Sequence, residues 1–154
     1  MNTRIFCAID YQEHSGWAAD AAIGISRAMS SKLIFFMANP VVMPSWGPVV
    51  YCWTIESINS LLNQARQRSR KAGVQETDCF TKDTADVAKS ILEESRLVSA
   101  SYIVIGSDFR SGTFCGWKHS ISRKVVEGAH CPTLVVHKNA WNPDIRSLQM
   151  LEAE

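Results

Sequence analysis

The sequence lacks any long hydrophobic run. No apolar stretch in the chain approaches the roughly 20 residues that a membrane-spanning helix needs. Residues 1–9 also lack the successive charged, apolar and small-residue zones of a secretory signal peptide. We therefore expect a cytoplasmic protein with no membrane partner.

The sequence also lacks an excess of charge of one sign. Lys and Arg number 16 against 15 Asp and Glu, which leaves a net charge of +1. Such a balance gives no electrostatic reason to expect nucleic acid as a partner. The 46% hydrophobic and 20% charged content is typical of a globular protein, and 154 residues suit one domain with its own core.

Paired cysteines are missing too. The five cysteines are an odd number without a C-x-x-C pair, and the four histidines show no zinc spacing, so we predict no metal site. Cys7, Cys79 and Cys131 fall in or beside predicted strands, where free cysteine behaves as a small buried hydrophobe. Cys115 lies in a polar stretch near Lys118, a setting in which a reactive thiol remains open.

Five short apolar runs alternate with four helical patterns. The predicted strands are Arg4–Ile9, Leu33–Ala38, Thr77–Lys82, Tyr102–Ile105 and Thr133–Val136. Ser15, Asp83-Thr84 and Ser120 are the expected caps of the first, third and fourth helices. The alternation predicts right-handed crossovers in an α/β, doubly wound parallel sheet with helices on both faces. The third run is weak and is expected at the sheet edge.

Residues 41–53 are the hardest segment to predict. Asn39-Pro40 is expected to end the second strand, and Pro44, Gly47 and Pro48 argue against regular structure beyond it. The segment is nevertheless too apolar for a free linker. We expect it to pack on its own domain; a lid over a pocket or a partner surface remains open.

The segment from Tyr102 to His137 carries the strongest functional pattern. A buried strand ends at Gly106-Ser107, a polar loop with Arg110 and Lys118 follows, and Ser120 opens a helix. A helix N-terminus at the carboxyl end of a strand offers free N–H groups and the positive end of the helix dipole. This arrangement predicts a site for a phosphate or another anion.

The same segment resembles the C-terminal half of the universal stress protein family. Nucleotide-binding members carry Gly, two residues, Gly, nine residues, and then Gly-Ser or Gly-Thr. The spacing agrees without a gap, and Gly106 and Ser120 match, but Phe109 and His119 stand where the second and third glycines belong. The resemblance implies a domain over residues 1–138. Residues 139–154 form a tail with the pattern of a short helix.

The resemblance implies a single domain of the adenine nucleotide alpha hydrolase-like kind, with a five-stranded parallel sheet in the order 3-2-1-4-5. It places Asp10 opposite adenine and ribose, and Met37 where backbone groups meet the adenine edge. An aspartate at a strand end can also simply hydrogen-bond its own turn, so both roles of Asp10 stay open. The implied nucleotide site consists of Ala8, Ile9, Asp10, Met37, Ile105, Gly106, Ser107, Ser120 and Ile121.

Two functions remain open. The favoured one is a dimeric regulatory module in stress response, with an unidentified protein partner and no tight ATP binding, because Phe109 lies where phosphates approach the backbone. The alternative is an adenine-nucleotide sensor for ATP or AMP, in which Arg110 and Lys118 offset the lost glycines. The resemblance implies a homodimer through Thr133–His137. No catalytic constellation is recognisable, so we predict no enzyme activity.

Overall fold

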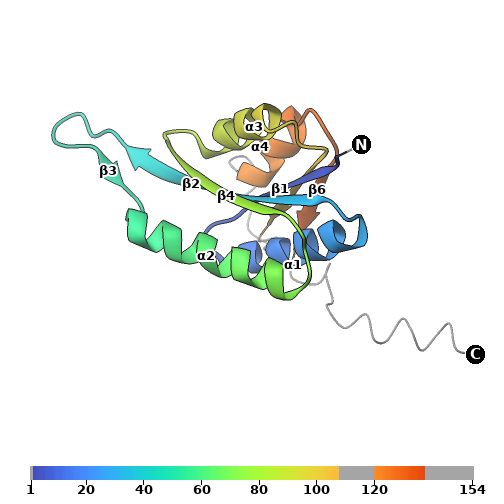
Figure 1. Ribbon diagram of the computed structural model, residues 1–154. Helices are drawn as coiled ribbons and strands as arrows, with labels where there is room; N and C mark the ends of the chain where they lie inside the picture. Colours follow the sequence, from blue (N-terminus) through green and yellow to red (C-terminus); the bar gives the residue numbers. More distant parts are fainter. Residues whose placement is uncertain (1, 108–119, 138–154) are drawn as a thin grey trace, which may run out of the picture.

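The computed structural model describes residues 2–107 and 120–137. Five parallel strands form its centre (Figure 1). They are β1 (Arg4–Ala8), β2 (Lys32–Val42), β4 (Thr77–Thr84), β5 (Tyr102–Gly106) and β6 (Thr133–Val136). The order across the sheet is β4-β2-β1-β5-β6, so the predicted doubly wound α/β fold and its 3-2-1-4-5 order are confirmed.

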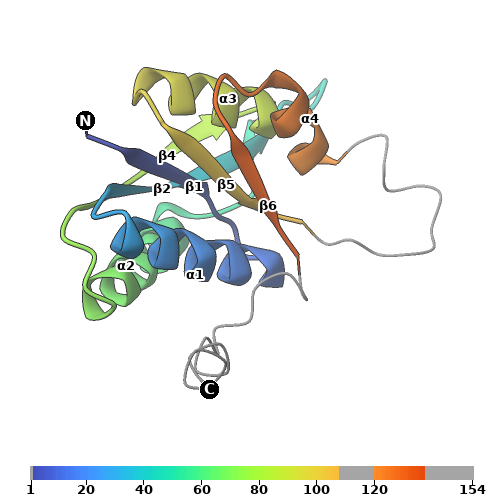
Figure 2. The same ribbon diagram turned by 90° about the vertical axis from the view of Figure 1, so that its right-hand side faces the viewer.

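Four helices cover the two faces of the sheet. Helices α1 (Glu13–Ala28) and α2 (Ile55–Lys71) lie on one face, and α3 (Val87–Leu97) and α4 (Ile121–Gly128) lie on the other (Figures 1 and 2). Because successive side chains of a strand point to opposite faces, each central strand contributes side chains to the core on both faces of the sheet. Cys7 packs toward α1 and α2, for example, whereas its neighbour Phe6 packs toward α3 and α4.

Only one of the three predicted helix caps is found in place. Ser120 caps α4 and accepts a hydrogen bond from the Arg123 N–H at 3.4 Å. Helix α1 instead begins after Gln12, and α3 begins after Asp86, whose carboxylate accepts from the Lys89 N–H. The prediction that Ser15 and Asp83-Thr84 cap these helices is wrong. The Ser15 hydroxyl hydrogen-bonds Asp10 in the preceding loop, and Asp83-Thr84 extends β4.

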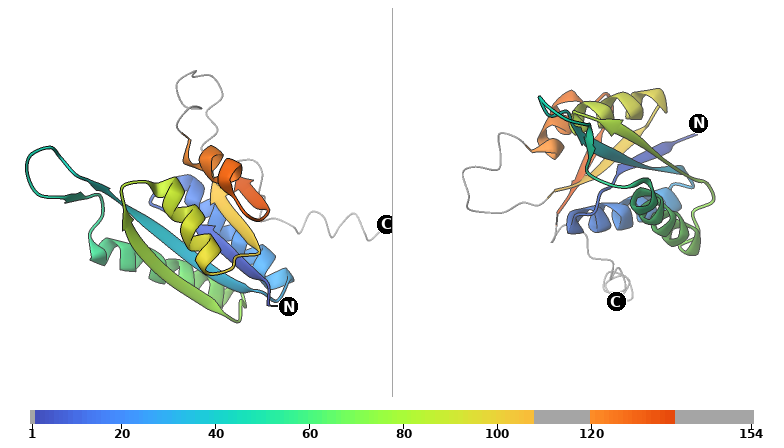
Figure 3. Two further views of the ribbon diagram at one scale, coloured as in Figure 1. Left: turned by 90° about the horizontal axis from the view of Figure 1, so that it is seen from above. Right: turned by 90° about the vertical axis from the view of Figure 1, so that its left-hand side faces the viewer.

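Strand β2 does not end at Asn39-Pro40 as predicted. It continues to Val42, and a short strand, β3 (Val50–Tyr51), returns antiparallel to it. Pro40 has no N–H to donate, but its carbonyl accepts a hydrogen bond from the Cys52 N–H at 2.9 Å, which joins the two strands of the hairpin. The resulting hairpin projects beyond the body of the sheet (Figure 3).

The hairpin also departs from the prediction that residues 41–53 pack on their own domain. At its tip Met43 is 73% exposed and Trp46 is 92% exposed. Only the return segment, defined as residues 49–54, is firmly held, through buried Asn39. The Asn39 side chain accepts from the Trp53 N–H at 3.1 Å and donates to the Trp53 carbonyl at 3.2 Å and to Asp83 Oδ1 at 2.9 Å.

Several predicted features lie outside the described residues. They are the tail 139–154 and the loop positions Phe109, Arg110, Cys115, Lys118 and His119. Within the described part of the chain, none of the helices has the length and apolar character required to cross a membrane.

Candidate functional site

A cavity of about 500 Å³ lies at the carboxyl ends of β1 and β5. This is the point where the crossovers diverge, toward β2 on one side and β6 on the other, and such points are the usual ligand sites of doubly wound sheets. Eight of the nine predicted site residues line the cavity. They are Ala8, Ile9, Asp10, Ile105, Gly106, Ser107, Ser120 and Ile121.

Met37 is the one predicted site residue that does not line the cavity. Its side chain is fully buried in the core beneath α1 and α2, and its carbonyl accepts a hydrogen bond from Thr81 Oγ1 at 2.7 Å. Its neighbour Ala38 lines the cavity instead, because successive side chains of β2 point to opposite faces of the sheet.

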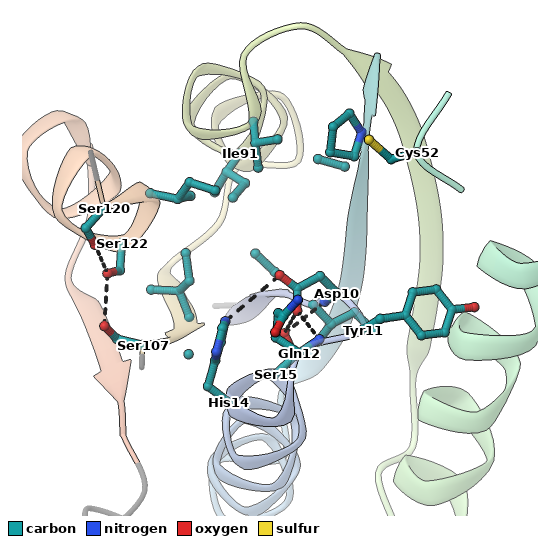
Figure 4. A pocket seen from close by; sticks show the side chains of 18 of the residues that line it. Asp10, Tyr11, Gln12, His14, Ser15, Cys52, Ile91, Ser107, Ser120 and Ser122 are labelled. Atoms are coloured by element: carbon teal, nitrogen blue, oxygen red, sulfur yellow. Dashed lines mark hydrogen bonds and ion pairs between the residues drawn. The ribbon is translucent and has the colours of Figure 1, made fainter. Parts of the chain in front are cut away.

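One side of the cavity is the aspartate wall, formed by Asp10, Gln12, His14 and Ser15 (Figure 4). Asp10 Oδ1 accepts hydrogen bonds from the Gln12 N–H at 2.7 Å and from Ser15 Oγ at 2.6 Å. Ser15 Oγ in turn accepts from the Asp10 N–H at 2.9 Å. Asp10 therefore does bond its own turn, one of the two roles left open by the sequence, and it does so through one carboxylate oxygen.

The second carboxylate oxygen faces His14, a residue that the sequence analysis did not select. The His14 Nε2 atom lies 3.9 Å from Asp10 Oδ2. The spacing in the sequence could have identified His14. It follows Asp10 by four residues, and the first turn of the helix after a strand lies at the same edge of the sheet as the strand's carboxyl end.

Gly106 is required by the packing of this same turn. A Cβ atom at position 106 would lie 2.3 Å from the His14 carbonyl oxygen and 2.7 Å from His14 Cδ2. The start of α1 thus packs directly on the backbone of β5. Gly106 has a structural role here that is separate from the phosphate contact implied by the family resemblance.

The opposite side of the cavity is the serine wall, formed by Ser107, Ser120 and Ser122 (Figure 4). Ser122 Oγ donates to Ser107 Oγ at 3.2 Å and lies 2.7 Å from Ser120 Oγ. Since the Ser122 proton is used on Ser107, Ser120 is the donor to Ser122. The Ser107 hydroxyl proton then has no acceptor among the described residues.

The serine wall is suited to an anion. It stands at the N-terminus of α4, where backbone N–H groups and the positive end of the helix dipole favour negative charge. Ser122 was missed by sequence reasoning, although its position two residues after the cap Ser120 places it in the first turn of the same helix.

Apolar groups close the space between the two walls. Val87 and Ile91 of α3 and Pro40 of β2 line it, and the return segment contributes Cys52 and Trp53 at the rim. The Trp53 ring contacts Tyr11, with ring centroids 4.5 Å apart, and the Tyr11 hydroxyl donates to the Ser57 carbonyl. The return segment therefore borders the cavity through Cys52 and Trp53, and a lid formed by residues 41–53 stays a prediction.

The described lining holds few ionisable groups. Asp10 is its only carboxylate and His14 its only basic side chain, and no described Lys or Arg borders the cavity. The Cys52 thiol is exposed at the rim. The other described thiols lie elsewhere, and burial raises the pKa of Cys7, Cys79 and Cys131.

Comparison with known proteins agrees with this architecture. The sequence model of the Universal stress protein family matches residues 1–137. The chain is 27% identical over 149 residues to "Universal stress protein YxiE" from Bacillus subtilis (strain 168), covering 88% of this chain and 99% of that protein.

Solved structures share the fold. A universal stress protein in complex with cAMP superposes with a TM-score of 0.70 at 22% identity, covering 88% of this chain and 97% of the other. The universal stress protein from Archaeoglobus fulgidus in complex with dAMP gives a TM-score of 0.66 at 21% identity, covering 86% and 96%. These likenesses establish a common architecture.

Proposed function

This chain belongs to the universal stress protein family, and we propose that it binds an adenine nucleotide with one phosphate group in the cavity between β1 and β5. Binding is the input of a regulatory protein, not a step of catalysis. The complexes of two structural relatives with cAMP and dAMP support the class of ligand.

The arrangement of the cavity is the observation that carries this proposal. The volume of about 500 Å³ lies within the usual range for small-molecule sites, roughly 300 to 1,000 Å³. Ile91 and Pro40 offer an apolar place for the base, Asp10 Oδ2 an acceptor for ribose hydroxyls, and the serine wall donors for the phosphate. The base, ribose and phosphate of a nucleotide follow one another in the same order as these three groups of the cavity.

The sequence supports a monophosphate over ATP. Of the three glycines that let phosphates approach the backbone in nucleotide-binding members, the chain keeps only the first, Gly106, together with the closing Ser120. Phe109 and His119 replace the other two. An aromatic ring cannot donate a hydrogen bond to an anion in place of a backbone N–H, so we expect ATP to bind more weakly than AMP or cAMP.

Titration calorimetry of the full chain with AMP, cAMP, ATP and adenosine tests the proposal, with a magnesium-free control and a parallel thermal-unfolding series. We expect saturable binding of AMP and cAMP and a rising unfolding midpoint, because a ligand that binds the folded state stabilises it. Absence of both signals at millimolar AMP and cAMP contradicts nucleotide binding.

We also propose that two copies of the chain pair through β6. This strand stands at one end of the sheet, and among the described strands it pairs only with β5 (Figure 2). Its Leu134 is 42% exposed, and an exposed apolar edge strand favours pairing with another chain. Sedimentation of the wild type and of Leu134→Lys tests this, since we expect a dimer that the substitution dissociates; a monomeric wild type contradicts it.

A further inference from the structure

We propose that His14 recognises the negative charge of the bound nucleotide and makes its affinity rise as the pH falls. The inference rests on the proposed nucleotide binding and concerns which side chain distinguishes a nucleotide from its uncharged nucleoside.

The position of the imidazole is the first argument. His14 is the residue of the aspartate wall that lies toward Ser107 of the serine wall (Figure 4). Its side chain is 22% exposed, so solvent and ligand reach it. The distance of 3.9 Å between Nε2 and Asp10 Oδ2 lies within ion-pair range for a protonated ring, but it is too long for a hydrogen bond that would occupy Nε2. The ring is therefore able to contact a ligand that spans the two walls.

The second argument is that the backbone of His14 is fixed in place. The His14 carbonyl and Cδ2 both pack against the Gly106 backbone, at the point where any side chain at position 106 would collide with them. This contact holds the first turn of α1 on β5. His14 is thus held where the ribose and phosphate of a nucleotide would meet, beside Ser107.

The charges around His14 decide the direction of the effect. Asp10, on the loop before α1, is the only carboxylate among the described residues that line the cavity, and its side chain is 41% exposed. Glu13 is exposed on α1 beside it, and His137 follows β6. The described lining residues in and beside β5 and α4, which are Ile105, Gly106, Ser107, Ser120, Ile121 and Ser122, carry no ionisable side chain.

With a neutral imidazole, the described cavity lining carries the single negative charge of Asp10. Protonation of His14 cancels that charge and supplies a charged donor next to the phosphate position. An anionic ligand therefore binds the protonated form more tightly, and its binding favours protonation. A hydrogen bond that gains charge assistance corresponds to about a tenfold change in affinity.

The test compares cAMP with adenosine from about pH 6 to about pH 8, a range that brackets the ordinary histidine pKa. The phosphodiester of cAMP keeps one negative charge throughout, whereas the phosphate of AMP titrates near pH 6 and would obscure the result. Dissociation constants are measured for the wild type, His14→Gln, His14→Lys and the matched control His130→Gln. His130 contacts the Ala100 carbonyl at 3.2 Å and does not line the cavity.

We expect the wild type and His130→Gln to bind cAMP about tenfold more tightly at the acid end of the range, with adenosine unaffected. In His14→Gln the affinity for cAMP no longer changes with pH. His14→Lys binds cAMP tightly at every pH because its charge is permanent over this range. If the wild type binds cAMP with the same affinity at every pH, or if the pH dependence persists in His14→Gln, the role of His14 is overturned and the proposed nucleotide binding is not. Failure of cAMP, AMP and adenosine to bind at any pH overturns the proposed function and this inference together.

Discussion

The two polar walls of the cavity use similar groups but differ in whether those groups are already satisfied. In the aspartate wall, Asp10 and Ser15 hydrogen-bond each other twice and the start of α1 rests on Gly106. In the serine wall, the hydroxyls form a chain that ends at Ser107, whose proton has no acceptor within residues 2–107 and 120–137. Asp10 Oδ1 and Ser15 therefore hold the fold, which leaves Asp10 Oδ2, His14 and the serine wall to receive a ligand.

The largest effect expected from this difference is on stability, at Gly106. Gly106→Ala should lower the free energy of unfolding by about 3 kcal/mol, because the new Cβ collides with the His14 backbone, which cannot rotate away. Urea denaturation measures the loss. Gly16→Ala is the matched control, since nothing lies within 4 Å of its added Cβ, and it should be neutral or stabilising by up to about 1 kcal/mol. Equal losses in the two variants contradict the packing role of Gly106.

The next effect is expected at Ser15. Ser15→Ala removes a buried hydroxyl that pairs with both the N–H and the carboxylate of Asp10, and should lower the free energy of unfolding by about 2 kcal/mol. Ser60→Ala on the exposed face of α2 should change it by less than about 0.5 kcal/mol. Urea denaturation of the two variants measures the difference in their free energies of unfolding. A Ser15→Ala protein as stable as Ser60→Ala would show that the aspartate wall is not a structural unit.

A smaller effect, on binding instead of stability, is expected in the serine wall. Ser120→Ala and Ser122→Ala should each weaken cAMP binding by about 1 kcal/mol, because each removes a hydroxyl from the chain that faces the phosphate. Adenosine affinity should stay unchanged, since adenosine has no phosphate. Calorimetry with both ligands gives the comparison, and equal weakening of adenosine would place the serine wall elsewhere on the ligand. Asp10→Asn is the converse variant, expected to weaken adenosine more than cAMP, because it also removes the negative charge that opposes the phosphate.

The smallest effect is expected at the rim between the walls. In a Cys115→Ser background at neutral pH, iodoacetamide should modify Cys52 first, because it is exposed whereas burial raises the pKa of Cys7, Cys79 and Cys131 and keeps them protonated. Bound cAMP should slow the reaction several-fold by covering the cavity mouth. Mass spectrometry of the Cys52 peptide follows the rate; an unchanged rate with saturating cAMP means that the ligand does not reach the return segment.

The raised pKa values also set a direction for stability against pH. A thiol whose pKa is higher in the folded than in the unfolded state contributes its stability below the unfolded value, and that contribution falls as the pH rises above it. The buried thiols should therefore make the fold less stable in alkaline solution, above about pH 9. Cys7→Ala should reduce this alkaline loss in thermal unfolding measurements.

The sequence by itself determined the five parallel strands, their alternation with helices and the Ser120 cap of α4. These features depend on local patterns: β-branched apolar runs form buried strands, and a hydroxyl before a helical repeat satisfies its first N–H groups. The same local patterns located Asp10, Gly106 and Ser120 at strand and helix ends, and parallel topology gathers such ends at one edge of the sheet.

Only the tertiary structure decided the remaining features. Strand β2 continues through Pro40, whose carbonyl accepts from the Cys52 N–H across the hairpin, and the Ala38 side chain lines the cavity while that of Met37 enters the core because the helices fix which face of β2 turns inward. The approach of His14 to Gly106 joins residues far apart in the chain, so no local pattern contains it. Local sequence specifies the helices and strands. Which face of the sheet a side chain lies on, and which side chains it contacts, depend on how those elements pack.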